Sequence, residues 1–139
     1  MTLTVALTDD LATCHALRRA VFVEEQAVPE DLEVDGLDGE AFHLLASWEG
    51  RPVGTARVLS LGETGKIGRV CVLEAMRGKG IGQALIRAAV EELRTRGFSR
   101  AKLGSQVHAI PFYEALGFTA EGPVYDDAGI PHRDMSLAL

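Results

Sequence analysis

Apolar and polar positions alternate at the start of the chain, as in a strand with one buried face. Residues 3–7 follow this alternation and predict a first strand. The segment Thr8-Asp9-Asp10 then offers side chains that can cap a helix, and apolar residues at helical spacing predict a helix over 11–23. Pro29 closes this region, so the first quarter of the chain reads as a strand followed by one helix.

The middle of the sequence reads as three strands joined by short turns. Apolar runs predict strands at 42–48, 53–61 and 66–73. Glycine-containing turns at 49–52 and 62–65 separate them, which favours an antiparallel meander.

The last part of the chain alternates helices with strands. An apolar stripe at helical spacing begins at Ile81, and Gly97 fits the stop of that helix. The strand at 101–106 can pair in parallel with the strand at 66–73, because a crossover helix separates them. A short helix ending at Gly117 then precedes a final hairpin, with strands at 122–126 and 131–137.

The length of 139 residues predicts one domain, 1–139, with a single core. No apolar run approaches the ~20 residues that cross a bilayer, and the N-terminus has no basic region or cleavage site. We therefore expect a cytoplasmic protein with no membrane contact. Cys14 and Cys71 are expected to be small buried residues in a reducing compartment, and mid-strand placement disfavours Cys71 as a nucleophile.

The net charge of −6 disfavours general binding to nucleic acid. Residues 66–105, however, hold nine basic and three acidic residues, which suits a polyphosphate ligand. Residues 24–40 instead hold eight carboxylates and no Lys or Arg. That segment is either a solvated acidic loop or an anionic funnel that attracts a cationic amine.

The positive region contains a glycine-rich helix start. Gly78, Gly80 and Gly82 alternate with other residues, and Arg77 and Lys79 add positive charge between them. Glycine permits close approach of a ligand to the backbone, and the first N–H groups of a helix favour an anion. The stretch therefore predicts a cradle for phosphate or pyrophosphate, although such a turn can also be purely steric.

Two familiar phosphate motifs do not fit this stretch. The Walker pattern requires Ser or Thr after Gly-Lys, and Gly80 follows Gly78-Lys79 here. The dinucleotide fingerprint requires glycine where this chain has Gln83 or Leu85.

The run Arg77-Gly78-Lys79-Gly80-Ile81-Gly82 resembles motif A of the GNAT superfamily of acetyl-CoA-dependent N-acetyltransferases. The segment from Gln106 to Phe118, with Tyr113-Glu114 and Gly117-Phe118, is similar to a second block of that family. Val21 to Asp35 looks like its ElaA-like branch. The resemblance implies an α/β (α+β) GNAT fold, with a mixed, twisted central sheet of about six to seven strands and helices on both faces.

The resemblance also implies how the cofactor is held. Arg77 to Gln83 would bind the pyrophosphate of acetyl-CoA, and the splayed strand Val70-Cys71-Val72 would pair with the pantetheine arm. The Val72 N–H is the candidate oxyanion donor. Gln106 stands where the family often has Asn, which leaves its pantetheine contact open. The full cofactor set is Val70, Cys71, Val72, Arg77, Gly78, Lys79, Gly80, Ile81, Gly82, Gln83 and Gln106.

Acyl transfer also needs an acid and a base. By resemblance, Tyr113 protonates the departing thiolate. Some members place a glutamate base on the strand at 66–73, which contains no carboxylate here. Catalytic candidates are therefore Glu25 and Asp35, with Glu33, His43 and His132 also open as bases. The acceptor pocket is expected to include Gln26, His43, Arg57, Arg69 and His132, and we assign no metal ligands.

The predicted function is transfer of an acetyl group from acetyl-CoA to a primary amine of a small molecule or peptide. A sensor or regulatory module that binds acyl-CoA without turnover is the alternative, and a nucleotide ligand also stays open. A homodimer is left open as well.

Overall fold

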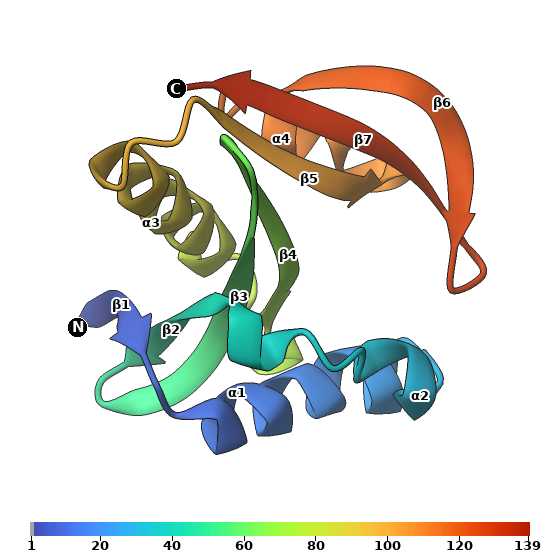
Figure 1. Ribbon diagram of the computed structural model, residues 1–139. Helices are drawn as coiled ribbons and strands as arrows, with labels where there is room; N and C mark the ends of the chain where they lie inside the picture. The colour runs from blue at the N-terminus through green and yellow to red at the C-terminus, as the bar shows by residue number, and fades with distance from the viewer. Residues whose placement is uncertain (1) are drawn as a thin grey trace.

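The computed structural model describes residues 2–139, which form one seven-stranded mixed sheet in the order β1-β2-β3-β4-β5-β7-β6 (Figure 1). The strands are β1 (Leu3–Thr8), β2 (Phe42–Trp48), β3 (Arg51–Leu61), β4 (Thr64–Val72), β5 (Arg100–Gln106), β6 (Thr119–Asp127) and β7 (Ile130–Ala138). The α-helices are α1 (Leu11–Arg18), α2 (Glu30–Glu33), α3 (Ile81–Thr95) and α4 (Ile110–Glu114). Shorter helical turns are η1 (Arg19–Glu25), η2 (Asp38–Glu40), η3 (Glu74–Met76) and η4 (Val107–Ala109). The predicted fold class is confirmed.

Two apolar layers hold helices on opposite faces of the sheet. Strand β2 shows the division, because Leu44 and Ala46 belong to the large core with α3, whereas Leu45 packs with Leu17 of α1. Figure 1 shows α3 and the α1–α2 segment on opposite sides of β2 and β3. Helix α3 packs so closely on β4 that a Cβ at Gly65 would overlap the Leu93 side chain.

Strands β4 and β5 pair in parallel as predicted, but only at one end. Their register covers Thr64–Arg100, Gly65–Ala101 and Lys66–Lys102. Beyond Lys66 the two strands separate, and β5 continues in full antiparallel pairing with β7. The separation leaves strand edges facing each other across a gap in the middle of the sheet.

A β-bulge in β4 lies at the start of that gap. Between the pairs Thr55–Cys71 and Arg57–Gly68, β4 has one more residue than β3, and Arg69 has a φ of 50°. The extra residue reverses the side-chain alternation. Ile67 therefore packs in the α3 core, while Cys71 packs with α1, and Arg69 reaches the loop after α2.

The predicted first helix is longer and less regular than its sequence pattern indicates. It runs as α1 to Arg18 and then continues as a π-helix to Glu25, two residues beyond the predicted end. The Gln26 N–H donates to the Val21 carbonyl at 3.0 Å, five residues back. The π-helix carries Phe22 and Gln26 to the edge of the gap between β4 and β5.

Candidate functional site

A cavity of about 430 Å³ opens where β4 and β5 separate. Its walls come from both strands, from η1 and the loop around α2, from α4 and from the β6–β7 hairpin. The cavity brings together eight of the predicted site residues and Glu33, an open base candidate: Gln26, Glu33, Asp35, Arg57, Arg69, Val70, Gln106, Tyr113 and His132. Segments from the whole length of the chain therefore meet at this gap.

The glycine-rich stretch forms an uncapped helix start near the same gap. Gly78 and Gly80 have φ values of 80° and 78°, a backbone region that L side chains rarely adopt. Gly80 is the N-cap of α3 and no side chain caps the helix there. The first N–H groups of this fifteen-residue helix are thus available to an anion, together with the positive end of its dipole.

Arg77 and Glu25, predicted for separate roles, are paired with each other in the structure. The Arg77 guanidinium donates to both Glu25 carboxylate oxygens at 2.6 Å, and its Nε donates to the Val72 carbonyl at 3.1 Å. The pairing lowers the pKa of Glu25, which lies outside the cavity. An ion-paired carboxylate is a weak base, so this geometry does not favour Glu25 in that role.

Most of the acidic segment 24–40 is exposed, but many of its charges are paired. Five of its eight carboxylates are paired with arginines that lie elsewhere in the sequence. The pairs are Glu25–Arg77, Glu30–Arg19, Glu33–Arg18, Asp35–Arg57 and Asp38–Arg18. The nearby arginines offset much of the negative charge, so these contacts do not favour the anionic funnel over the solvated alternative.

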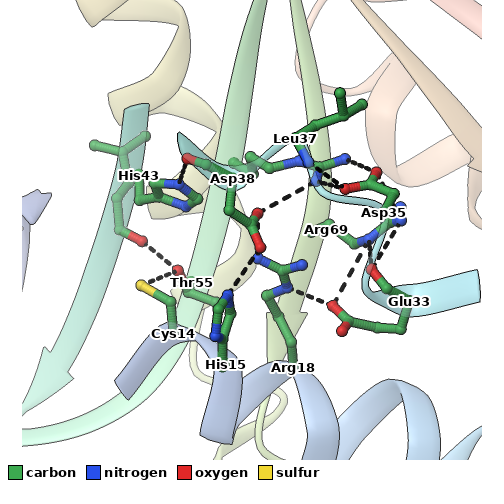
Figure 2. Close-up of polar contacts among 12 residues, drawn as sticks. Cys14, His15, Arg18, Glu33, Asp35, Leu37, Asp38, His43, Thr55 and Arg69 are labelled. Atoms are coloured by element: carbon green, nitrogen blue, oxygen red, sulfur yellow. Dashed lines mark hydrogen bonds and ion pairs between the residues drawn. The ribbon is translucent and has the colours of Figure 1, made fainter. Parts of the chain in front are cut away.

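Arg18, Arg57 and Arg69 form one partly buried network with Glu33, Asp35 and Asp38 behind the cavity wall (Figure 2). Arg18 is fully buried and donates to Glu33 at 2.5 Å and to Asp38 at 2.8 Å. Arg57 holds Asp35 with two hydrogen bonds of 2.8 and 2.9 Å. Arg69 adds bonds to the Glu33 carbonyl and to Asp35. The network ties the loop after α2 to β3 and β4, so it fixes one wall of the cavity.

The network also changes the acidity of Asp35 and Asp38. Hydrogen bonds from Arg57 lower the pKa of Asp35 to about 2. Burial opposes ionisation of Asp38, but hydrogen bonds from Arg18 and His15 outweigh it and hold the pKa well below its usual range. Both carboxylates are therefore ionised and committed to cations near neutral pH, which disfavours Asp35 as a base.

His43 does not join the other predicted pocket residues. It is buried, and its Nε2 donates to the Asp38 carbonyl at 3.0 Å. The ring lines a smaller cavity near β1, together with Leu11 and Arg96. His43 thus holds the backbone of the acidic segment at Asp38 and lies outside the main cavity.

Tyr113 and Gln106 lie on the α4 side of the main cavity. The Tyr113 ring packs edge-on against Phe112 and Phe118, with centroids 5.0 and 6.2 Å away, and burial raises the pKa of its hydroxyl. The Tyr113 phenol therefore remains protonated near neutral pH. The Gln106 side chain donates from Nε2 to Gln26 Oε1 at 3.5 Å, and its Oε1 lies 2.7 Å from His108 Nε2.

The β6–β7 hairpin supplies cavity residues that the sequence did not single out. Tyr125 stacks on His132, with centroids 6.0 Å apart and planes at 26°, and its hydroxyl donates to Asp134 at 2.9 Å. A Cβ at Gly104 would overlap that hydroxyl, so glycine on β5 lets the ring lie in this position. The alternation of residues along β6 could have predicted which face of the sheet Tyr125 lies on. Its position at the cavity depends on the pairing of β7 with both β5 and β6, which local sequence does not reveal.

The chain matches known proteins along most of its length. A family model described as "Acetyltransferase (GNAT) domain" matches residues 7–139. Protein ElaA of Escherichia coli (strain K12) is 38% identical over 125 residues, covering 86% of this chain and 82% of ElaA. The chain belongs to the GNAT acetyltransferase family, as an ElaA-like member.

Solved structures agree with that assignment. The crystal structure of Escherichia coli ElaA superposes with a TM-score of 0.84 at 32% identity, covering 97% of each chain. An acyl-CoA N-acyltransferase from Pseudomonas aeruginosa gives a TM-score of 0.86 at 32% identity, over 97% of this chain and 99% of that one. A Bacillus subtilis acetyltransferase in complex with CoA shares the fold, with a TM-score of 0.78 at 18% identity over 99% of each chain. The fold and family together define a GNAT acyltransferase.

Across residues 2–139, no helix has both the length and the apolar character needed to cross a membrane.

Proposed function

We propose that this protein is an N-acetyltransferase that moves an acetyl group from acetyl-CoA to a primary amine. One observation carries the proposal: the uncapped start of α3 lies against the end of β4 and against α4, where a Cβ at Gly82 would contact Val72 and Phe112, and the cavity between β4 and β5 is lined by Tyr113. A phosphate site, free strand edges and a proton donor are the parts that such a transfer requires.

The residues of the cradle fit a pyrophosphate. The N–H groups of Ile81, Gly82 and Gln83 would hold it, since Gly80 adds no side chain above the helix start. Arg77 would add charge after leaving Glu25. Lys79, whose ammonium lies 5.5 Å from the Trp48 ring centroid, is a second exposed cation at this end.

The strand edges fit an extended amide-bearing arm. Beyond Lys66, β4 is no longer paired with β5, so the free backbone edge at Val70 to Val72 would pair with the amides of a pantetheine in the gap. The Val72 N–H would support an oxyanion, and Gln106 would contact the arm from β5. A Bacillus subtilis acetyltransferase with the same fold was solved in complex with CoA, which supports CoA as the class of ligand.

Tyr113 would supply a proton as the bond to sulfur breaks. Its hydroxyl is protonated because burial raises its pKa, and Tyr113 lies at the cavity wall. Bound acetyl-CoA supplies a thioester, whose acyl carbon accepts the amine. Protonation of the departing thiolate by Tyr113 would disfavour its return to the acyl carbon.

The acceptor would be a small molecule or peptide whose amine reaches the cavity from its open side. Glu33, Asp35 and Asp127 line this cavity along with Arg57, Arg69 and Lys66, so fixed charges of both signs are equal in number. Leu32, Leu59 and Ile130 add apolar surface. A partly apolar amine therefore fits better than a polycation. The two unpaired, buried cysteines suit a reducing compartment, and we place the reaction in the cytoplasm.

Binding and turnover test this proposal separately. Calorimetry with acetyl-CoA, CoA, ATP and NAD should show binding of the first two only. A panel of primary amines and peptides, with acetyl-CoA, should then release free thiol above the uncatalysed rate. Binding of acetyl-CoA with no turnover on any amine would favour a sensor, and preference for ATP or NAD would overturn the CoA assignment.

A further inference from the structure

We infer that His132 is the general base of the transfer, acting through its Nε2 atom; this rests on the function proposed above. The reaction needs such a group because an alkylamine is protonated at neutral pH and must lose a proton before its nitrogen can attack. His132 sits on β7 and lines the cavity, directly opposite Gln106 of β5 in the sheet register.

The hydrogen bond to the backbone fixes the tautomer of this ring. The His132 Nδ1 lies 2.7 Å from the Ile130 carbonyl oxygen. A carbonyl oxygen only accepts, so Nδ1 carries the hydrogen and donates it. In the neutral ring the lone pair then lies on Nε2, the atom that a general base needs.

Comparison with the other three histidines shows that this arrangement is specific to His132. His15 uses Nε2 toward Asp38 at 2.8 Å, and His43 uses Nε2 toward the Asp38 carbonyl at 3.0 Å. His108 uses Nε2 toward the Gln106 side chain at 2.7 Å. Only His132 bonds through Nδ1, and within residues 2–139 no protein group is bonded to its Nε2.

The ring is also held in place from its face. Tyr125 of β6 stacks on it, and Tyr125 is itself anchored by the hydrogen bond to Asp134 of β7. Stacking and the backbone bond together restrict both side-chain torsions of His132. A base with a fixed direction accepts a proton with less reorganisation than a mobile one.

The other cavity groups are poorly suited to take the proton. Glu33 and Asp35 are bound to arginines, and Arg57, Arg69 and Lys66 are cations. Tyr113 is protonated and suited to the opposite role. Asp127 is exposed at the hairpin turn, where water solvates its carboxylate.

The proton balance is simple. His132 Nε2 takes one proton from the ammonium, which frees the nitrogen lone pair for attack. Once the N–C bond has formed, the nitrogen is acidic and loses its second proton to water. As the C–S bond breaks, the Tyr113 hydroxyl proton passes to the thiolate. Water then takes the proton from His132 and returns one to Tyr113. Summed over the cycle, an ammonium and a thioester give an amide, a thiol and one released proton.

The test compares two probes of nearly equal shape, phenethylamine and O-benzylhydroxylamine. The first is an ammonium at neutral pH and the second is already neutral. The variant His132→Asn keeps a side-chain donor for the Ile130 carbonyl but lacks Nε2. It should slow single-turnover transfer to phenethylamine by about 100-fold or more, and transfer to O-benzylhydroxylamine much less. Calorimetric affinity for CoA should stay the same.

The pH profile gives a second readout. The acid limb of kcat/KM for phenethylamine should flatten in His132→Asn, whereas His15→Asn, which removes a histidine outside the cavity, should retain it. The ionisable groups around His132 are Tyr125 of β6, which stacks on it, and Tyr113 of α4 and Asp127 at the hairpin turn, which line the same cavity. Equal loss on both probes would identify a merely structural role and overturn the inference.

A measurement without any acceptor completes the test. Nitrogen-15 NMR of neutral His132 should show the Nδ1-protonated tautomer, and the Nε2-protonated form would overturn the inference directly. Failure of the native protein to acetylate any amine would instead count against the proposed function. A native protein that acetylates both probes, with His132→Asn equally fast on phenethylamine, would remove only the base assignment.

Discussion

Glu25 and Arg77 lie fifty-two residues apart in sequence and form a two-point ion pair, with both N–O distances at 2.6 Å. The pair joins the π-helix, which carries a cavity wall, to the turn that precedes α3. Because pyrophosphate and the Glu25 carboxylate would compete for one guanidinium, binding at the cradle and the position of η1 are expected to be coupled.

Replacing Glu25 by Gln should therefore strengthen CoA binding. The partly exposed pair contributes up to about 1 kcal/mol, so affinity should rise up to about fivefold when Arg77 is released. Calorimetry at fixed ionic strength measures the change, with Glu24→Gln as the matched control. In an Arg77→Gln background the gain should disappear. A gain that persists there would mean that Glu25 acts only through its own charge.

Gly80→Val should weaken CoA binding by at least tenfold, or ~1.4 kcal/mol, because the new side chain lies over the first N–H groups of α3. The substitution also strains a backbone with positive φ. Gly97→Val, at the other end of the same helix, introduces the same strain with φ of 83° and open space around it. Equal CoA affinity in both folded variants would contradict the cradle.

Tyr113→Phe removes one hydroxyl and keeps the aromatic contacts with Phe112 and Phe118. Folding and CoA affinity should change little, while the chemical step slows by about 10²- to 10⁴-fold. Single-turnover measurements are needed, since slow product release can hide the effect. An unchanged rate would leave Tyr113 a packing residue, with water as the proton donor.

Asp35→Asn should make the free energy of unfolding less dependent on pH in the acid range. The pKa of Asp35 is about 2 in the folded chain and close to 3.9 when unfolded, so its stabilisation is present above the higher value. It is lost as pH falls toward the lower value. After solvent screening we expect a cost of about 1 kcal/mol at neutral pH, and a smaller one in acid. Urea unfolding measures both, with Asp31→Asn, an exposed position, as control. The same cost at every pH would contradict the ion-pair account.

The strands and most of the fold could be predicted from the sequence because their signals are local. Alternation located β1 to β4, and the glycines located the start of α3. The bulge at Arg69 could not be predicted in this way, since arginine is not a residue that favours positive φ. The π-helix could not be predicted either, because over seven residues its pattern of apolar side chains cannot be distinguished from that of an α-helix.

The site was predicted less completely than the fold. Motif spacing indicated the glycine-rich start of α3 and Tyr113, which belong to continuous segments, and Tyr113 does line the cavity. The pairing of acidic residues with Arg18, Arg57 and Arg69 depends on distant segments, so counting charges along 24–40 could not reveal it. His43 and His132 looked equivalent in sequence, and only their ring contacts distinguish them.

Cys14 and Cys71 are both buried, and burial raises the pKa of the Cys71 thiol to about 12. A chromogenic disulfide reagent should consequently not react with the folded chain, and it should measure only the CoA thiol that turnover releases. The same two thiols become reactive when α1 lifts from β4, because that contact covers Cys71. The rate at which they are labelled in a resting sample therefore measures how often this layer of the protein opens.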